Sequence, residues 1–198
     1  MKRIAIAGGI GAGKSAVSDR LVERGYTVID TDAVARTVTA VGQPAWRALR
    51  DAFGSAVLGP DGTLDRAFLA DVVFHDPSAL RRLNHITHGY IGLDVIDQLN
   101  RATGDAVFVA LPLFRPEHRA AFQIDEAWAV MVSPDTAVQR LVAHRGYSVA
   151  DAQARLANQI SNDERAAIVD RVIWNEGSLD DLYGLLDDAL SELEPVRG

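Results

Sequence analysis

Residues 8–15 read Gly-Gly-Ile-Gly-Ala-Gly-Lys-Ser and match the whole phosphate-binding pattern G-x-x-x-x-G-K-[ST]. The apolar run at 4–7 predicts a strand before this loop, and the helical spacing of Val17 and Leu21 predicts a helix after it. A glycine-rich loop between a strand and a helix N-terminus can turn its backbone N–H groups toward an anion. The competing interpretation is a glycine-rich turn of an ordinary Rossmann-like protein, but the Lys-Ser pair favours a nucleoside triphosphate.

Each residue type in the loop has a chemical reason to be there. Lys14 can reach the terminal phosphates, and the Ser15 hydroxyl can be a ligand of magnesium. The nucleotide-binding residues that we expect in and beside the loop are Gly8, Gly9, Ile10, Gly11, Ala12, Gly13, Lys14, Ser15 and Ala16.

Composition limits the partners that this chain can have. Its 198 residues, with 48% hydrophobic content, suffice for one α/β core and an inserted subdomain. The formal net charge of −7 argues against general nucleic-acid binding, because no long basic run offsets it. The chain contains no cysteine, which excludes disulfides and thiolate metal sites, and no apolar run approaches the length of a membrane span. We therefore expect a cytoplasmic protein that binds small molecules, not nucleic acid or membrane.

Four further apolar runs predict strands, at 26–29, 106–111, 127–132 and 171–174. Strands that alternate with helices favour an α/β fold with a five-stranded parallel sheet flanked by helices. Residues 42–103 contain no strand-like run and are interpreted as an inserted helical region. We expect residues 1–41 and 104–198 to form the nucleotide-binding core, in which residues from about 140 to 165 form a helical lid.

Two carboxylates, Asp30 and Asp32, follow the strand predicted at 26–29. In an open parallel sheet the carboxyl ends of the strands face the ligand. While the chain stays extended, residues i and i+2 share one face, so both carboxylates could reach the ligand. Asp32, the further out, is expected to meet the phosphate acceptor and to take part in catalysis. The alternative is that Asp32 only caps a helix at 33–39.

Three arginines, Arg140, Arg145 and Arg155, lie in the predicted lid. Ser133 and Ser148 predict the starts of its two helices. A guanidinium fork stabilises the spread negative charge of phosphoryl transfer, so the arginines suit a lid that closes over phosphates. A solvated charged face explains any one of the three equally well.

Missing patterns argue against motor-like ATPases and GTPases. No acidic residue closes the strand at 106–111, whereas many P-loop hydrolases hold magnesium with such an aspartate. The chain also has no Asn-Lys-x-Asp pattern for reading guanine. His85 and His88 stand at i and i+3 without a further ligand pattern, and we predict no zinc site there.

The chain resembles the dephospho-coenzyme A kinases over nearly its whole length. Beyond the loop, the resemblance rests on Val28-Ile29-Asp30-Thr31-Asp32 with Arg36, Asp61-Gly62-Thr63-Leu64-Asp65-Arg66, Leu83-Asn84 with His88, Arg155 with Gln159, and Val172-Ile173 with Asn175 and Gly177. It implies a P-loop kinase fold with an inserted helical acceptor domain and a lid. The implied reaction transfers the γ-phosphoryl of ATP, with Mg²⁺, to the ribose 3′-hydroxyl of dephospho-coenzyme A, the last step of coenzyme A synthesis.

The resemblance also implies roles for particular residues. By the family pattern Asp32 resembles the general base, Lys14 and Ser15 serve phosphate and magnesium, and Asn175 and Gly177 lie near the adenine. The expected catalytic residues are then Asp32, Lys14, Arg140 and Arg145. The expected acceptor-binding residues are Asp30, Asp32, Arg36, His88 and Leu111.

The departures from the family pattern fall in parts expected to face the acceptor. After His88 the family usually has proline and, a few positions on, a basic residue, but this chain has Gly89 and Gly92, which should weaken or bend their helix. Where the family typically reads Pro-Leu-Leu-Phe-Glu, this chain has Arg115, with Glu117 slightly later. Either these changes are ordinary drift and Glu117 replaces the missing carboxylate, or the acceptor has changed or the activity has declined. The alternatives are a related kinase with another hydroxyl acceptor and a non-catalytic nucleotide-binding regulator.

Overall fold

The computed structural model describes residues 1–193, which divide into two compact units. The first unit comprises Met1–Asp30 and the chain from Arg101 onward, and the second comprises Thr31–Asn100. The second unit starts at Thr31 and not at residue 42, because helix α2 (Thr31–Val38) packs against α3 (Pro44–Phe53) of the same unit. Within residues 1–193, no helix has the length and apolar character that crossing a membrane requires.

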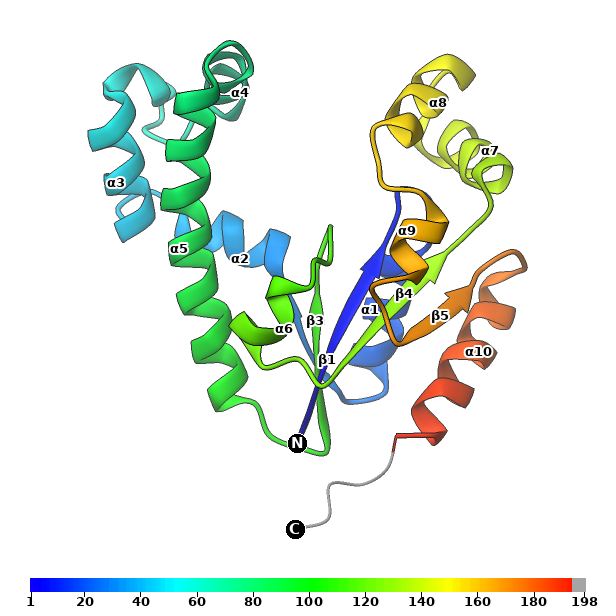
Figure 1. The fold of residues 1–198 in the computed structure, drawn as a ribbon. Coiled ribbons are helices and arrows are strands. Elements are labelled where there is room, and N and C mark those ends of the chain that lie inside the picture. The colour runs from blue at the N-terminus through cyan, green and yellow to red at the C-terminus, as the bar shows by residue number, and fades with distance from the viewer. Residues whose placement is uncertain (194–198) are drawn as a thin grey trace. The chain divides into compact units, whose positions relative to one another are not determined.

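All five predicted strands are present, and they are parallel. They form one sheet in the order β2-β3-β1-β4-β5. Figure 1 labels β3, β1, β4 and β5 of this sheet. The strands are β1 (Lys2–Gly8), β2 (Thr27–Asp30), β3 (Ala106–Ala110), β4 (Glu126–Met131) and β5 (Arg171–Trp174). The central strand β1 has β3 on one side and β4 on the other. The loop that leaves β1 therefore lies at the switch point of the sheet, where open parallel sheets bind their ligands.

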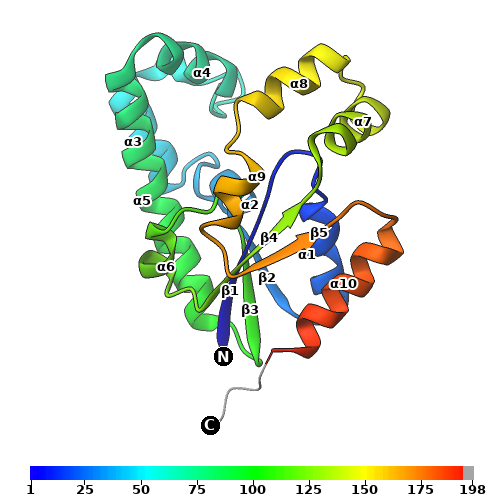
Figure 2. The ribbon, with the colours of Figure 1, turned by 45° about the vertical axis from the view of Figure 1, so that its right-hand side comes forward.

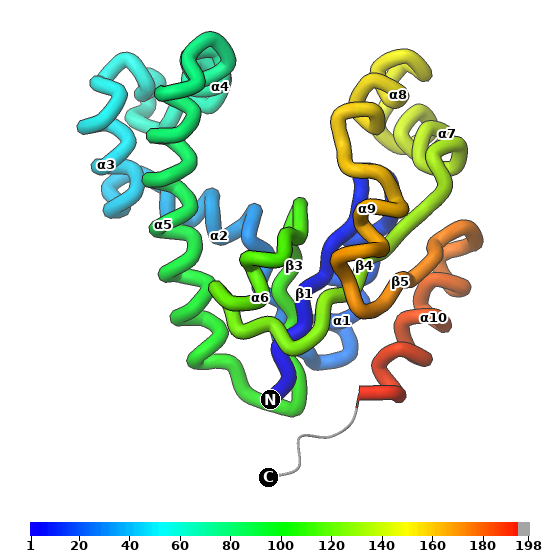
Figure 3. Tube along the Cα trace, viewed as in Figure 1, coloured from blue at the N-terminus to red at the C-terminus, as the bar shows by residue number. Residues whose placement is uncertain are grey.

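The described part of the first unit contains six helices. They are α1 (Lys14–Glu23), α6 (Glu117–Phe122), α7 (Pro134–Arg145), α8 (Val149–Ala157), α9 (Asn162–Ala166) and α10 (Leu179–Ser191). The side chains of Ser133, Ser148 and Ser178 accept hydrogen bonds from N–H groups of the following turn, as their sequence context predicts. The short helices α6 and α9 lie where the sequence patterns predict no helix. The trace in Figure 3 leaves β4 through α7 and α8 and returns through α9 to β5.

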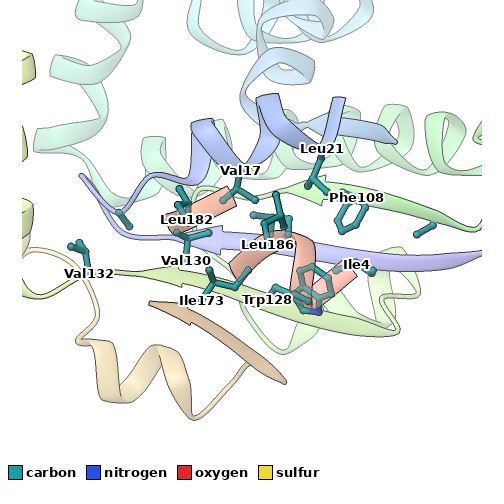
Figure 4. Packing of buried hydrophobic residues seen from close by; sticks show 14 of the residues in the cluster. Ile4, Val17, Leu21, Phe108, Trp128, Val130, Val132, Ile173, Leu182 and Leu186 are labelled. Atoms are coloured by element: carbon teal, nitrogen blue, oxygen red, sulfur yellow. The ribbon is translucent and has the colours of Figure 1, made fainter. Parts of the chain in front are cut away.

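Helices α1 and α10 pack on the strands and bury the core of the first unit (Figure 4). Val17 and Leu21 of α1 and Leu182 and Leu186 of α10 are at most 1% exposed. They belong to one cluster with strand residues that include Trp128. Burying this much apolar surface fixes α1 on the sheet, so the loop that joins β1 to α1 is anchored at both ends.

The elements of the second unit are helices, as the sequence predicts for this region. Besides α2 and α3 they are the short 3₁₀ helix η1 (Ser55–Val57), α4 (Arg66–His75) and α5 (Pro77–Arg101), whose last residue belongs to the first unit. Asp76 Oδ1 accepts a hydrogen bond from the Ser78 N–H at 2.7 Å, which fixes the start of α5. Gly89 and Gly92 lie inside α5, which continues through both.

The two glycines of α5 offer a test of helix stability. Apart from its chain neighbours and the backbone of the surrounding helical turns, a Cβ at either position would meet no described atom within 4 Å. We expect Gly89→Ala and Gly92→Ala each to raise the free energy of unfolding by about 0.5–1 kcal/mol, because alanine loses less backbone entropy in a helix. Chemical denaturation measures the change. The control is Gly62→Ala, which also has open space around the Cβ position but a φ of +79°, and which should therefore destabilise. Destabilisation by both helix variants would contradict the prediction.

Candidate active site

The phosphate-loop sequence forms a turn between β1 and α1 that requires glycine at two positions. Gly11 and Gly13 have φ values of 76° and 96°, in the left-handed region. The Ala12 N–H donates to the Gly9 carbonyl at 3.2 Å and closes the turn. The side-chain amide of Asn175 occupies the space that a Cβ on Gly13 would need. Glycine at position 13 thus sets both the backbone direction and the room for a neighbouring side chain.

Asn175 connects the end of β5 to the loop. It is 6% exposed, and its Nδ2 donates a hydrogen bond to the Ala12 carbonyl at 2.9 Å. Arg140 of α7 donates from Nη2 to Asn175 Oδ1 at 3.3 Å and to the Gly177 carbonyl at 3.1 Å. The structure therefore brings together predicted site residues from three segments that are far apart in sequence: the loop, Arg140, and Asn175 with Gly177.

Glu176 ties the same segment to the start of α7, a contact that the sequence did not indicate. Its carboxylate accepts hydrogen bonds from the Ser133 N–H, from the Ser133 hydroxyl at 3.1 Å and from the Thr136 hydroxyl at 2.8 Å. The bond from the Ser133 N–H and then that from Thr136 hold the pKa of Glu176 below its ordinary value. A carboxylate at a helix N-terminus is also favoured by the helix dipole. Glu176 thus fixes the base of α7 beside Asn175.

A cavity of about 580 Å³ lies beside the loop, within the first unit. Gly9 and Ile10 line one part of it, and the connection from α8 to α9 lines another. Gln159 Oε1 in that connection accepts a hydrogen bond from the Ile10 N–H at 3.1 Å. Arg165 of α9 also lines the cavity and is 6% exposed. The sequence alone indicates no role for Arg165, although Ser161-x-x-Glu164 predicts a capping box just before it.

The other residues expected to bind phosphate or magnesium lie on α1 and on the lid helices. Lys14 and Ser15 are the first two residues of α1, and Lys14 is half-buried while Ser15 is exposed. Arg145 is exposed at the end of α7, and the Arg155 guanidinium stacks 4.4 Å from the centre of the Tyr147 ring. Figure 2 shows α7 and α8, which pack together, in yellow-green and yellow. Of the lid arginines, Arg140 makes the contacts with Asn175 and Gly177.

The residues expected to bind the acceptor divide between the two units. In the first unit, Asp30 ends β2 in register with Ala110, and Leu111 follows β3, is 4% exposed and donates its N–H to the Ile6 carbonyl at 2.9 Å. In the second unit, Asp32 and Arg36 are exposed on α2, one helical turn apart, and His88 is exposed on α5.

One expectation about the carboxylates is wrong. The chain does not stay extended from Asp30 to Asp32, because α2 begins at Thr31 and its apolar face packs inward through Thr31 and Val34. Asp32 therefore lies inside the first turn of the helix and does not precede it as an N-cap. Asp30 and Asp32 are separated by the change from strand to helix and do not share one strand face.

The protein itself supplies few metal ligands. Across residues 1–193, no group of three or more His, Asp or Glu side chains is arranged to hold a metal ion. His85 and His88 are both exposed on α5. A cation at this site would depend on a hydroxyl such as that of Ser15 and on oxygens of a bound ligand.

Comparison with known proteins assigns the family. The family model described as dephospho-CoA kinase matches residues 2–181. The chain belongs to the dephospho-CoA kinase family. The resemblance found on the sequence motifs is thereby confirmed over nearly the whole chain.

Curated members of the dephospho-CoA kinase family match almost end to end. The dephospho-CoA kinase of Streptomyces avermitilis is 41% identical over 193 residues, which cover 98% of this chain and 94% of that protein. The dephospho-CoA kinase of Corynebacterium glutamicum is 38% identical over 196 residues, which cover 98% of each chain.

Solved structures support the fold of this dephospho-CoA kinase family member. A crystal structure of a Thermus thermophilus protein is 31% identical and matches with a TM-score of 0.80, covering 98% of each chain. The dephospho-CoA kinase of Campylobacter jejuni is 22% identical, covers 98% of this chain and 97% of its own, and matches with a TM-score of 0.64. A shikimate kinase of Acinetobacter baumannii is 15% identical, covers 98% and 96%, and matches with a TM-score of 0.57. The predicted P-loop kinase fold with a five-stranded parallel sheet is confirmed.

Gly13→Ala tests the loop geometry. We expect it to lower the free energy of unfolding by about 1–3 kcal/mol, because alanine is strained at this positive φ and displaces Asn175. ATP affinity, measured by calorimetric titration, should fall with it. Gly184→Ala is the control, since Gly184 lies in α10 with open space around it and should leave the affinity unchanged. Full ATP affinity in Gly13→Ala would show that Asn175 and the loop tolerate a different arrangement.

Proposed function

We propose that this protein is an ATP-dependent kinase that phosphorylates the ribose 3′-hydroxyl of dephospho-coenzyme A and so produces coenzyme A. The observation that carries the proposal is the match of residues 2–181 to the dephospho-CoA kinase family, with curated relatives of that name at 38–41% identity over 98% of the chain. The intact loop at the switch point of the sheet supports the nucleotide half of the proposal.

The first unit binds ATP in this proposal. The backbone N–H groups of residues 8–16 hold the phosphates, and Lys14 at the start of α1 contacts the terminal ones. The adenine lies by Asn175 and Gly177, which the loop contact of Asn175 places next to Ala12. Arg140, already hydrogen-bonded to both, is near the nucleotide, and Arg145 is the second lid arginine assigned to catalysis.

Magnesium fits the residues of the loop. Mg²⁺ usually takes one or two protein oxygens and completes its shell with substrate phosphates and water. The exposed hydroxyl of Ser15, at the second position of α1, is such an oxygen, and no carboxylate cluster is required. When bound, the ion supplies charge neutralisation on the phosphates.

The second unit, Thr31–Asn100, binds the acceptor in this proposal, together with Asp30 and Leu111. Asp32 is the general base, and Arg36 and His88 contact the acceptor. The 3′-hydroxyl oxygen forms a bond to the γ-phosphorus while the bond from that phosphorus to the bridging oxygen breaks. The hydroxyl proton passes to the Asp32 carboxylate, and ADP leaves.

An ADP-release assay across a panel of acceptors tests the function. We expect dephospho-coenzyme A to be preferred over adenosine and AMP, because its pantetheine arm offers remote contacts that orient the ribose. No preference, with slow ATP hydrolysis remaining, would show that the acceptor has changed. The exposed Arg115, whose Nη1 lies 3.8 Å from Glu117 Oε1, is the residue that such an outcome would implicate first.

A further inference from the structure

Within the part of the chain that the structure describes, Arg165 is a buried charge without a charged partner. The residue is 6% exposed, and its Nη1 donates a hydrogen bond to Asn162 Oδ1 at 3.2 Å. Among residues 1–193, no carboxylate lies within ion-pair distance of its guanidinium. Burial alone lowers the pKa of Arg165, with no opposing contribution from an anion. A buried charge left in this way is costly unless an anion joins it.

The guanidinium of Arg165 lies against the phosphate loop. A Cβ built on Gly9 would be 3.5 Å from both terminal nitrogens of Arg165 and 3.1 Å from Gln159 Oε1. These side chains and Ile10 line the same cavity of about 580 Å³. The buried positive charge therefore faces the space beside the loop.

The sequence around Arg165 fixes its position. Ser161 and Glu164 form a capping box that starts α9, with the Ser161 N–H donating to Glu164 Oε2 at 2.8 Å. Asn162 Nδ2 donates to the Val132 carbonyl at 2.8 Å, which ties α9 to the end of β4. The helix that carries Arg165 is thus attached to the end of β4, whereas Arg145 and Arg155 are exposed on α7 and α8. A guanidinium held in advance of binding loses little entropy when an anion arrives.

An arginine of this unit that serves only the structure differs from Arg165 in having a carboxylate partner. Arg119 of α6 donates to Asp170 Oδ2 at 2.8 Å, which satisfies its charge within the protein. Arg165 has no such carboxylate among residues 1–193. Asn175 contacts the loop at Ala12, whereas the Arg165 guanidinium lies beside Gly9, nearer the start of the loop. With the base at Asn175, as proposed above, the phosphate chain would run from Ala12 toward Gly9 and the Arg165 guanidinium.

We propose that Arg165 binds the terminal phosphate of the bound nucleoside triphosphate and stabilises its charge during phosphoryl transfer. This inference rests on the proposed kinase function. In the structure Gln159 Oε1 accepts from the Ile10 N–H beside Arg165, and this amide is the group that the phosphate displaces. Arginine forks that reach the transferred phosphoryl group contribute strongly to its transfer.

Nucleotide titrations without acceptor test the proposal. We compare Arg165→Gln with the wild-type chain, using ADP and the non-hydrolysable β,γ-imido analogue of ATP at fixed Mg²⁺. The Kd of the analogue should rise about tenfold or more, and the Kd of ADP less than about twofold, because ADP lacks the terminal phosphate. In a separate assay with dephospho-coenzyme A present, the kcat for ADP release should fall about 100-fold or more.

The control is Arg119→Gln, which removes another arginine of the first unit that has its own carboxylate. It should lower the melting temperature and leave both nucleotide affinities unchanged. If Arg165→Gln fails to fold, Arg165→Lys keeps the charge but loses the fork, and should still weaken the analogue more than ADP. Equal losses for the two nucleotides, or no loss for either, would overturn the proposal. Because the titrations contain no acceptor, the two Kd values can be interpreted even if dephospho-coenzyme A proves not to be a substrate.

Discussion

Asp32→Asn should lower the kcat for phosphorylation of dephospho-coenzyme A by about 100-fold or more, while ATP affinity changes by less than about twofold. The amide keeps the shape of the carboxylate but cannot accept the hydroxyl proton. Asp32 is exposed in the first turn of α2, directly after β2, so the substitution leaves the packed face of that helix unchanged. Steady-state kinetics with saturating ATP and a separate ATP titration measure the two quantities.

Asp30→Asn is the matched control, because Asp30 ends β2 two residues earlier and should have the smaller effect on kcat. An equally large loss of ATP affinity in Asp32→Asn, with chemistry intact at saturation, would make Asp32 a metal or nucleotide ligand. Comparable losses of kcat in both variants would show that Asp32 is not the single general base that accepts the hydroxyl proton.

The features that could be predicted from sequence are those set by neighbours along the chain. A left-handed φ at Gly11 and Gly13 follows from the loop motif, and the caps at Ser133 and Ser178 follow from the serine and the turn after it. The three central strands, β1, β3 and β4, were predictable because a strand buried in a parallel sheet is a continuous apolar run. The edge strands β2 and β5 are only partly buried and were predictable from short runs of strand-forming residues.

Contacts between distant segments carry no local signal and were missed. Glu176, which follows β5, accepts a hydrogen bond from Ser133 at the start of α7. The Arg165 guanidinium of α9 lies beside Gly9 of the loop. Neither Glu176 nor Arg165 belongs to a sequence motif from which its partner could be identified. The burial of Arg165 depends on the whole first unit being folded, and a sequence position alone does not distinguish it from the exposed Arg145.

The border of the second unit could not be read from composition either. Residues 31–41 look like the continuation of a nucleotide-binding core, since β2 precedes them. Thr31 and Val34 are buried, however, and α2 packs against α3. A segment belongs to the unit in which its apolar face is buried. The helical spacing of apolar residues shows that such a face exists but not which partner covers it.

Lys14→Met should reduce kcat/KM for ATP by about 100-fold, or about 2.7 kcal/mol of transition-state stabilisation. The lost interaction is a charge-assisted contact with the phosphates, while the methylene stem and the start of α1 are kept. The sequence offers an unusually close control, since its two lysines are Lys2 and Lys14. Lys2 Nζ pairs with Glu126 Oε1 at 2.8 Å, so Lys2→Met should affect stability and leave turnover unchanged.

The same pair of lysines permits a test without mutation. Amine acetylation, followed by peptide mass spectrometry, reports how fast each ammonium group reacts. ATP with Mg²⁺ should slow the acetylation of Lys14, because its amine is then held by phosphate, and should leave Lys2 unaffected. ADP should protect less if Lys14 contacts the terminal phosphate and equally if its contact is confined to the inner phosphates. Equal reactivity of Lys14 with and without ATP, together with unchanged turnover in Lys14→Met, would remove Lys14 from the nucleotide site, because a lysine that binds phosphate cannot satisfy both results.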